Sequence, residues 1–316
     1  MESFSDRKKN MNILVTGGLG HIGSKLIRNL IADRNKNIVI VDSLLTLKEI
    51  SIFGMDLHQI KFYAESIETF RKNSINNHSY DLVIHLAART FPSESIQEVL
   101  YEENYKNTVS IVDYCLEYQV PIIFPSSCSV YYGTGGKVNE ESHIKKGISR
   151  YSDQKIMEEK LIIEAGNLGL KYLILRLGTI HGVSSGIRFH TAVNKFCLDA
   201  VLNKQIEVWS GALSSYKPYL ALEDFASMIN FAINLEFYPN KIFNLVTNTY
   251  SVLQIKEFIE ELIGYKIRVK TLPTNLGSNE SLHVSTDEIK KHGFTFQGSI
   301  RKDIEETINL LKGQIV

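Results

Sequence analysis

The sequence predicts an α/β fold built on a doubly wound parallel sheet, followed by a smaller mixed C-terminal part. Two observations lead to this prediction. Short apolar runs of strand length alternate with segments long enough to be crossover helices, and a glycine-rich turn lies between the first run and the first such segment. Alternation of this kind builds a parallel sheet that is covered by helices on both faces.

The composition is that of a folded protein without net charge. Of the 316 residues, 44% are hydrophobic and 22% are charged, and 35 lysines and arginines balance 35 aspartates and glutamates. A disordered or fibrous protein is therefore excluded. Because a neutral chain has no net field that attracts polyanions, we expect no nucleic-acid partner.

The cysteines and the hydropathy pattern favour the cytoplasm as the compartment of this protein. The three cysteines, Cys115, Cys128 and Cys197, are odd in number and widely spaced, which favours a reducing environment over a disulfide framework or a structural zinc site. Residues 1–10 are polar, and no later stretch approaches about 18 uninterrupted apolar residues. We expect a cytoplasmic protein with a flexible tail at 1–10 and no membrane partner.

The first part of the chain supplies most of the predicted sheet. The predicted strands are 12–16, 38–42, 60–63, 82–86, 122–125 and 172–177, and the main predicted helices are 22–32, 101–118 and 152–165.

The alternation loosens after Gly182. Helices are still predicted at 188–203, 221–235 and 253–263, and a buried strand at 241–246. We expect residues 181–316 to form mainly a substrate-binding part, with segments near 221–250 returning to the first core. No proline-rich linker separates the two parts, so a cleft between them is expected.

The first glycine turn has the pattern of a dinucleotide-binding loop. It runs from Thr16 to Gly23 and contains G-x-G-x-x-G (Gly18, Gly20, Gly23) as well as G-x-x-G-x-x-G (Gly17, Gly20, Gly23). Missing β-carbons let a pyrophosphate approach the backbone, and the helix N-terminus offers free N–H groups. The alternative is a tight turn without a ligand. The predicted cofactor contacts here are Gly17, Gly20, His21, Ile22 and Gly23.

An acidic residue follows at the distance that such a loop requires. Asp42 ends the second predicted strand, some twenty residues after the turn. Its carboxylate would accept hydrogen bonds from both ribose hydroxyls and repel a 2′-phosphate, which favours NAD over NADP. The alternative is a helix cap.

A serine, a tyrosine and a lysine form a candidate catalytic set. Tyr151 and Lys155 are four residues apart, so they share one face of the predicted helix, and a serine cluster at 126–129 follows the strand that ends near Pro125. An ammonium close to a phenol stabilises the phenolate, which lets the tyrosine exchange a proton with an alcohol. The alternative for Tyr151 and Lys155 is an exposed helix face.

Together these motifs resemble those of an extended short-chain dehydrogenase/reductase of the nucleotide-sugar epimerase/dehydratase kind. The resemblance covers nearly the whole chain from Met11. It rests on T-G-G-x-G-x-I-G at 16–23, H-L-A-A at 85–88, an asparagine at 104, S-S-x-S-V-Y at 126–131, Y-x-x-x-K at 151–155 and R-x-x-x-x-x-G at 176–182. It implies a Rossmann domain over residues 11–180 that binds NAD.

The resemblance also implies individual roles. Tyr151 would be the acid/base, Lys155 would bind the nicotinamide ribose and tune the tyrosine, and Ser127 would orient the sugar hydroxyl, with Ser126 as the competing choice. His85 is interpreted as a structural residue. Further cofactor contacts would come from Glu65, Ser66, Leu86, Ala87, Ala88 and Asn104.

Departures from the family pattern bear on the reaction. Family 4,6-dehydratases have an Asp-Glu pair directly after the catalytic Ser/Thr, whereas this chain has Cys128 and Ser129. Dehydration and decarboxylation are therefore disfavoured. We expect an NAD-dependent nucleotide-sugar epimerase that acts at C4 through a transient 4-keto sugar. The alternatives are a keto-sugar reductase, which Asp42 disfavours mildly, and a non-catalytic protein that senses a dinucleotide.

The residues expected to bind the substrate match the family pattern less closely than those expected to bind the cofactor. Relatives often have asparagine where Thr179 stands and arginine where Lys217 stands, and both residues are candidates for contacts with the substrate. A lysine can still meet a diphosphate as a point charge, but it lacks the two-pronged contact of an arginine. Ser129 is a candidate for the sugar ring, and Arg188 and Asn194 are candidates for the substrate diphosphate, with capping or surface roles as the alternative. His181 and His190 have no partners at metal-ligand spacing, so no metal is expected. We expect a homodimer that forms through helices 101–118 and 152–165.

Overall fold

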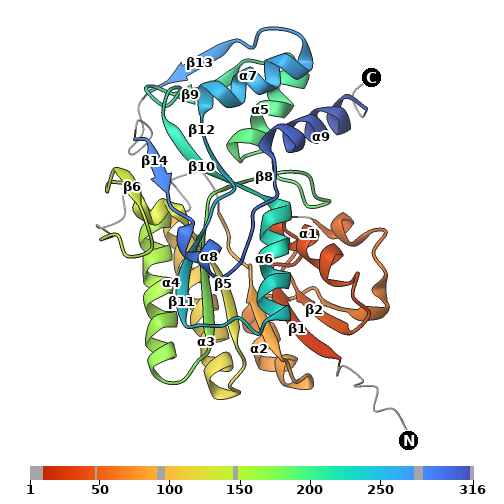
Figure 1. Cartoon of the computed structure of the whole chain (residues 1–316). Helices are drawn as coiled ribbons and strands as arrows, with labels where there is room; N and C mark the ends of the chain where they lie inside the picture. Colours follow the sequence, from red (N-terminus) through yellow and green to blue (C-terminus); the bar gives the residue numbers. More distant parts are fainter. Residues whose placement is uncertain (1–9, 47, 91–96, 145–148, 274–279, 314–316) are drawn as a thin grey trace, which may run out of the picture.

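The computed structural model describes residues 10–46, 48–90, 97–144, 149–273 and 280–313, and every structural statement below concerns these residues (Figure 1). The predicted tail at 1–10 lies outside them except for Asn10. Within the described ranges, no helix has both the length and the apolar character that crossing a bilayer requires.

A seven-stranded sheet forms the centre of the fold. Its strand order is β11-β7-β5-β4-β1-β2-β3, and every neighbouring pair is parallel, which confirms the predicted doubly wound α/β fold. The order reverses between β1 and β4, which opens a crevice at their carboxyl ends. The strands are β1 (Met11–Thr16), β2 (Lys36–Val41), β3 (Ile60–Tyr63), β4 (Leu82–His85), β5 (Ile122–Ser127), β7 (Tyr172–Leu177) and β11 (Lys241–Leu245).

Both faces of this sheet are buried, because alternate side chains of each strand enter different cores. Along β1, Ile13 and Val15 belong to one core and Leu14 to the other, and all three are fully buried. Helices α1 and α6 cover the first face, and α2, α3 and α4 cover the second (Figure 1). These helices are α1 (His21–Leu30), α2 (Ile67–Asn73), α3 (Gln97–Glu117), α4 (Arg150–Asn167) and α6 (Leu222–Asn234).

A smaller lobe stands beyond the carboxyl ends of the strands. It has a core of its own, in which Phe196, Ile255 and Ile304 pack together from α5, α7 and α9. The helices are α5 (Ala192–Val201), α7 (Val252–Ile263) and α9 (Ile300–Lys312). The strands of its mixed sheet are β8 (Thr179–His181), β10 (Tyr216–Ala221) and β12 (Asn248–Ser251), and β9 (Ile206–Trp209) pairs with β13 (Val269–Leu272).

The chain passes back and forth between the two parts. Helix α6 packs on α1, and β11 pairs with β7, so the second half of the sequence completes the sheet of the first. A further return places α8 (Asp287–Lys291) beside β11, and β14 (Leu282–Val284) pairs with β6 (Gly136–Val138). The short 3-10 helices are Glu49–Ile52, Leu57–Gln59, Ile75–Asn77 and Cys128–Tyr131.

The helix expected over 188–203 begins later in the structure. Helix α5 starts at Ala192 and follows Thr191, which is extended. The two guanidinium nitrogens Nη1 and Nη2 of Arg188 donate to Thr90 Oγ1 and to its carbonyl oxygen, at 3.1 and 3.0 Å. These tertiary contacts hold Arg188 in the loop that precedes the helix.

Helix α4 begins with a capping box. Ser149 Oγ accepts a hydrogen bond from Ser152 N at 3.2 Å, and Ser152 Oγ accepts one from Ser149 N at 3.1 Å. Both N–H groups are thereby satisfied by side chains, which stabilises the helix start. The box fixes the beginning of the helix that carries Tyr151 and Lys155.

A buried ion pair joins α4 to the sheet. Arg176 of β7 donates from Nη2 and Nε to the two carboxylate oxygens of Glu159, at 2.6 and 2.9 Å, and both side chains are about 5% exposed or less. Ser126 Oγ donates to the same carboxylate at 2.5 Å. Arg176 Nη1 also donates to Tyr131 Oη at 2.7 Å. The position of α4 on the sheet therefore depends on a fully partnered charge pair.

We predict that Arg176→Leu lowers the free energy of unfolding by about 3–5 kcal/mol, because it leaves the Glu159 carboxylate buried without its cation. Urea denaturation measures this loss. The matched control is Lys72→Ala, which removes one side of the exposed pair between Lys72 and Glu68 on α2 and should cost at most about 0.5 kcal/mol. Equal effects of the two substitutions would contradict a stabilising role for the buried pair.

Candidate active site

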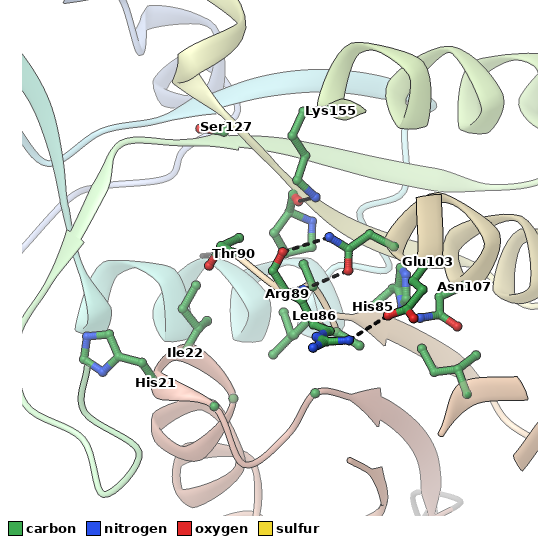
Figure 2. Close-up of a pocket in the computed structure, with 18 of the residues that line it drawn as sticks. His21, Ile22, His85, Leu86, Arg89, Thr90, Glu103, Asn107, Ser127 and Lys155 are labelled. Atoms are coloured by element: carbon green, nitrogen blue, oxygen red, sulfur yellow. Dashed lines mark hydrogen bonds and ion pairs between the residues drawn. The ribbon is translucent and has the colours of Figure 1, made fainter. Parts of the chain in front are cut away.

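A cavity of about 1670 Å³ opens at the carboxyl ends of the central strands, where the strand order reverses. It extends from the glycine turn and the end of β2 to the smaller lobe. Figure 2 shows His21 and Ile22 at the start of α1 on one side, and Ser127 and Lys155 on the other.

The three glycines of G-x-x-G-x-x-G line the cavity, but for different reasons. Gly17 has φ +67°, and a β-carbon there would lie 2.7 Å from Ala87 Cα; one on Gly23 would lie 2.6 Å from the Gly18 carbonyl oxygen. A β-carbon on Gly20 would have only the Gly17 oxygen nearby, at 3.4 Å. Gly17 and Gly23 are thus required by the packing of the turn, whereas Gly20 leaves an open cradle at the N-terminus of α1. This cradle fits a pyrophosphate.

Gly18 belongs to the packing and not to the cavity surface. A β-carbon at this position would lie 2.7 Å from Ile40 Cγ2 and 2.8 Å from Ile27 Cδ1. Gly18 therefore lets α1 approach the sheet closely. Such close packing of helix and strand is one of the roles that glycines have in a dinucleotide-binding turn.

The carboxylate of Asp42 faces the cavity at the end of β2. Its Oδ2 accepts a hydrogen bond from Leu19 N at 3.0 Å, and its Oδ1 accepts one from Leu44 N at 3.0 Å. These bonds orient the group within the turn, so Asp42 is not a helix cap. Each carboxylate oxygen has a second lone pair, which leaves acceptor capacity for ribose hydroxyls.

Glu65 and Ser66 line the cavity beyond Asp42. The Oε2 atom of Glu65 is buried and has no hydrogen-bond partner in the described structure, so a ligand donor could satisfy it there. Ser66 is the N-cap residue of α2, since its Oγ accepts a hydrogen bond from Thr69 N at 3.1 Å.

Leu86, Ala87 and Ala88 follow β4 along the cavity wall. Asn104 of α3 supports the next residue of this loop: its Oδ1 accepts from Arg89 N at 2.8 Å and its Nδ2 donates to Arg89 O at 2.9 Å. His85 lies deeper, with Nδ1 2.7 Å from Thr16 Oγ1 and Nε2 3.2 Å from Thr108 Oγ1.

Burial lowers the pKa of His85 to about 4, so the imidazole is neutral near pH 7. It joins β4 to β1 and α3 through two threonine hydroxyls, which is a structural arrangement.

The structure brings Tyr151, Lys155 and Ser127 to one side of the cavity. Lys155 is 4% exposed; its Nζ donates to the Pro125 carbonyl oxygen at 3.4 Å and lies 4.5 Å from the centre of the Phe124 ring. Burial alone would lower the pKa of Lys155, but the charges of Glu158 and Tyr151 outweigh it and leave the pKa raised. Lys155 is therefore an ammonium ion at neutral pH.

The two neighbouring serines have different surroundings. Ser126 is 3% exposed and its hydroxyl is engaged by Glu159. Ser127 Oγ accepts a hydrogen bond from Ser129 N at 3.1 Å, which leaves its own proton available to the cavity that it lines. This geometry favours Ser127 over Ser126 as the serine that contacts a substrate.

The two positions after Ser127 carry no carboxylate. Cys128 is buried, its Sγ lies 3.4 Å from the Arg176 carbonyl oxygen, and burial raises the pKa of the thiol. Ser129 Oγ is buried without a partner in the described structure. The carboxylates among the described lining residues all precede β5 in the chain: Asp42, Glu65, Glu68, Glu103 and Glu117.

Of the residues predicted for the substrate, Ser129, Thr179 and Arg188 line the cavity, whereas Asn194 and Lys217 do not belong to its described lining. Asn194 is fully buried, and its Nδ2 donates to the Arg188 carbonyl oxygen at 3.2 Å. Lys217 Nζ donates to the Glu280 carbonyl oxygen at 2.8 Å and lies over the Tyr132 ring. The predicted contacts of these two residues with a substrate therefore stay a prediction.

His21 also lies beside Asn194. Its Nδ1 lies 2.8 Å from Ser184 Oγ and its Nε2 lies 3.3 Å from Asn194 Nδ2, so it connects the start of α1 to the loop before α5 and to α5 itself. Burial lowers the pKa of His21 to about 3, with Arg188 adding to the shift. A neutral imidazole contacts a diphosphate as a hydrogen-bonding group and not as a charge.

Sequence reasoning missed Trp209 and Lys48. Trp209 ends β9, is 43% exposed and lines the cavity at the smaller lobe, where an aromatic face can stack on a nucleobase. Lys48 lines the cavity near the cofactor end, and its Nζ donates to the Ile187 carbonyl oxygen at 3.1 Å. The single tryptophan of the chain was a usable signal, whereas nothing in the local sequence marks Lys48.

Comparisons with known proteins identify the family. The model of the "NAD dependent epimerase/dehydratase family" matches residues 13–245. The chain is 28% identical to UDP-glucose 4-epimerase of Lactobacillus helveticus over 296 residues, covering 86% of this chain and 88% of that one. It is 25% identical to UDP-glucose 4-epimerase of Streptococcus mutans over 304 residues, covering 89% and 90%.

A similar fold occurs in the crystal structure of UDP-glucuronic acid 4-epimerase from Bacillus cereus, solved in complex with UDP-glucuronic acid and NAD. The TM-score is 0.86 at 22% sequence identity, and the match covers 96% of this chain and 100% of that one. At this identity the likeness concerns the fold.

We predict that Gly20→Ala folds normally but weakens NAD binding by about tenfold or more, which corresponds to about 1.4 kcal/mol. Gly20 has φ −66° and ψ 177°, a conformation open to alanine, so the added methyl group affects only the cradle. Titration calorimetry with NAD and the NAD-dependent rise in Tm measure the effect. Gly313→Ala, at the end of α9, is the control. Unchanged affinity of Gly20→Ala would show that the pyrophosphate binds elsewhere.

Proposed function

The chain belongs to the NAD-dependent epimerase/dehydratase family, and from this membership we propose that it is a nucleotide-sugar epimerase acting at C4 through a transient 4-keto sugar. One observation carries the proposal. Tyr151, Lys155 and Ser127 line the same cavity as the glycine cradle, while the two positions after Ser127 provide neither of the carboxylates that dehydration would use.

The residues of the cofactor end fit NAD. The cradle at Gly20 would receive the pyrophosphate, Asp42 the adenosine ribose and Glu65 a donor of the adenine end. The charge of Asp42 opposes a 2′-phosphate, which supports NAD over NADP. When bound, NAD supplies the reversible two-electron oxidation that the reaction needs.

Tyr151 is the proposed acid/base. Its phenolate would take the proton of the sugar hydroxyl as the carbon is oxidised, and the phenol would return a proton to the carbonyl oxygen when the carbon is reduced from the other face. The ammonium of Lys155 stabilises the phenolate, and the hydroxyl of Ser127 orients the sugar oxygen by a hydrogen bond. A single proton carrier is sufficient for this chemistry.

Dehydration would require two more groups, an acid for the departing hydroxyl and a base for the neighbouring carbon. The thiol of Cys128 is buried, bound to a backbone oxygen and raised in pKa, so it does not serve as a base. The hydroxyl of Ser129 is too weak an acid and base for either task. The site supports epimerisation for this reason.

The substrate end suits a nucleotide sugar. The indole of Trp209 offers a stacking surface for a base, and Arg188 offers a guanidinium for the diphosphate. Ser129 and Thr179 supply hydroxyls for the sugar. The relatives named for UDP-glucose support a nucleotide-linked hexose, and we propose no particular nucleotide.

We further propose a cytoplasmic homodimer that forms through α3 and α4. The two helices lie side by side on the outside of the sheet (Figure 1), and Met157 of α4 is 51% exposed. All three cysteines are free and buried, which supports a reducing compartment. Light scattering of the purified protein should give twice the chain mass, and a monomer mass would contradict the dimer.

Activity is tested by incubating the purified protein with a panel of nucleotide sugars. We expect interconversion of C4 epimers, detected by NMR, without net consumption of NADH. Oxidation of NADH in proportion to product would instead identify the keto-sugar reductase. NAD binding without turnover of any sugar in the panel would support the sensing protein.

We expect Tyr151→Phe to lower kcat by about 10²–10⁴-fold while NAD still binds, because only the proton carrier is removed. Ser127→Ala should also lower kcat. The matched control is Ser126→Ala, which removes a hydrogen bond to Glu159 and should lower Tm more than kcat. A larger kcat loss in Ser126→Ala than in Ser127→Ala would exchange their roles.

A further inference from the structure

A second buried carboxylate lies on α4 directly behind the lysine of the candidate active site. Glu158 is 1% exposed, and its Oε2 lies 2.9 Å from Nζ of Lys155. Lys155 precedes Glu158 by about one turn of the helix. This pair is separate from the neighbouring pair of Glu159 with Arg176, which faces β7. The family roles described above assign nothing to Glu158.

The other carboxylate oxygen of Glu158 is held from two helices. Its Oε1 accepts hydrogen bonds from Thr108 Oγ1 of α3 at 2.9 Å and from Gln154 Nε2 of α4 at 2.8 Å. Asn104 Nδ2 in turn donates to Gln154 Oε1 at 3.4 Å. Two hydrogen bonds from neutral donors stabilise the charged form of the carboxylate and fix its direction. Glu158 is therefore a preorganised anion.

The position of this anion determines how Lys155 is presented. An ammonium ion has three N–H donors. Lys155 donates one to the Pro125 carbonyl oxygen at 3.4 Å, and the Glu158 carboxylate attracts the same ammonium at 2.9 Å, while Lys155 also lines the cavity. Without Glu158, the long lysine side chain would keep only the weaker contact to Pro125 and the face of Phe124.

The same anion lies beside the ammonium that interacts with Tyr151. A lone ammonium would stabilise the phenolate strongly, and a tyrosine held as phenolate is a poor proton donor. An epimerase needs its tyrosine to accept a proton and to return it in one cycle, so the phenolate must not be stabilised too strongly. A carboxylate beside the ammonium offsets part of the positive charge.

We propose that Glu158 is a positioning residue that orients Lys155 and offsets its charge, so that Tyr151 can serve as base and acid in the same turnover. This inference rests on the proposed function for its purpose, but the charge relation among the three residues can be measured without any substrate.

Other charged and titratable groups also face this set. Glu159 lies on α4, Tyr101 on α3 has its ring centre 6.4 Å from that of Tyr151, His85 on β4 is neutral, and Arg188 reaches the cavity from the loop before α5. All remain unchanged when Glu158 alone is replaced, so a difference between matched variants reports Glu158.

The test is Glu158→Gln, which keeps the shape and the hydrogen-bonding capacity at Oε1 but removes the charge. The ultraviolet absorbance of tyrosinate is followed during a pH titration, and the Tyr151→Phe background is subtracted to isolate Tyr151. Because the carboxylate favours retention of a proton by the Tyr151 and Lys155 pair, we expect the tyrosinate midpoint of Glu158→Gln to fall by about one pH unit or more. The acid limb of kcat/KM should move in the same direction.

Glu164→Gln is the matched control, since Glu164 is exposed on the same helix and its replacement removes the same charge. It should leave the midpoint unchanged. Glu158→Asp keeps the charge on a shorter side chain and should give an intermediate midpoint, and it serves as the test variant if Glu158→Gln does not fold.

An unchanged or raised midpoint in the folded variants would overturn the proposal, and so would a loss of Tm without any change in the titration. The titration needs no nucleotide sugar, so failure to find epimerase activity leaves its result intact. Conversely, an active epimerase with an unshifted midpoint would refute the role of Glu158 alone.

Discussion

The site depends on how one helix is fixed to the sheet. Helix α4 carries Tyr151 and Lys155, and the side chains that hold it are charged and buried. Glu159 binds Arg176 of β7 and Ser126 of β5, so the helix is held in direction and in register against the strands that end at the cavity. Charges in such surroundings require well-oriented partners, and the partners define a single geometry.

The second constraint is the close approach of backbone to backbone at the glycine turn. Gly17 meets the chain after β4, and Gly23 meets the turn itself, so side chains at either place would separate β1, β4 and α1. Among the four glycines of this turn, Gly20 alone has room for a β-carbon. The turn is therefore both a packing element and an anion cradle, and the reversal of strand order beside it provides the space for a dinucleotide.

Much of this arrangement could be read from sequence because the signals are local. The apolar runs predicted all seven strands of the sheet, since a strand buried on both faces must be apolar along its length. The motifs also predicted the helix that carries Tyr151 and Lys155. Contacts that depend on distant partners escaped prediction: Glu158 is one of many helix carboxylates until Thr108 is placed against it, and the hydrogen bond from Asn194 to the Arg188 carbonyl oxygen appears only in the folded chain.

The sequence by itself determined the α/β class, the glycine cradle with Asp42, the tyrosine and lysine on one helix face, and the lack of an acidic pair after Ser127. These features follow from periodicity and residue type, which act over a few residues. Three features were decided by the tertiary structure alone. Ser126 donates its hydroxyl proton to Glu159 whereas Ser127 keeps its own, Arg188 lies in a loop, and Glu158 forms an ion pair with Lys155. Burial and pairing arise between segments far apart in the chain, and they set the protonation of the side chains that the proposed chemistry uses.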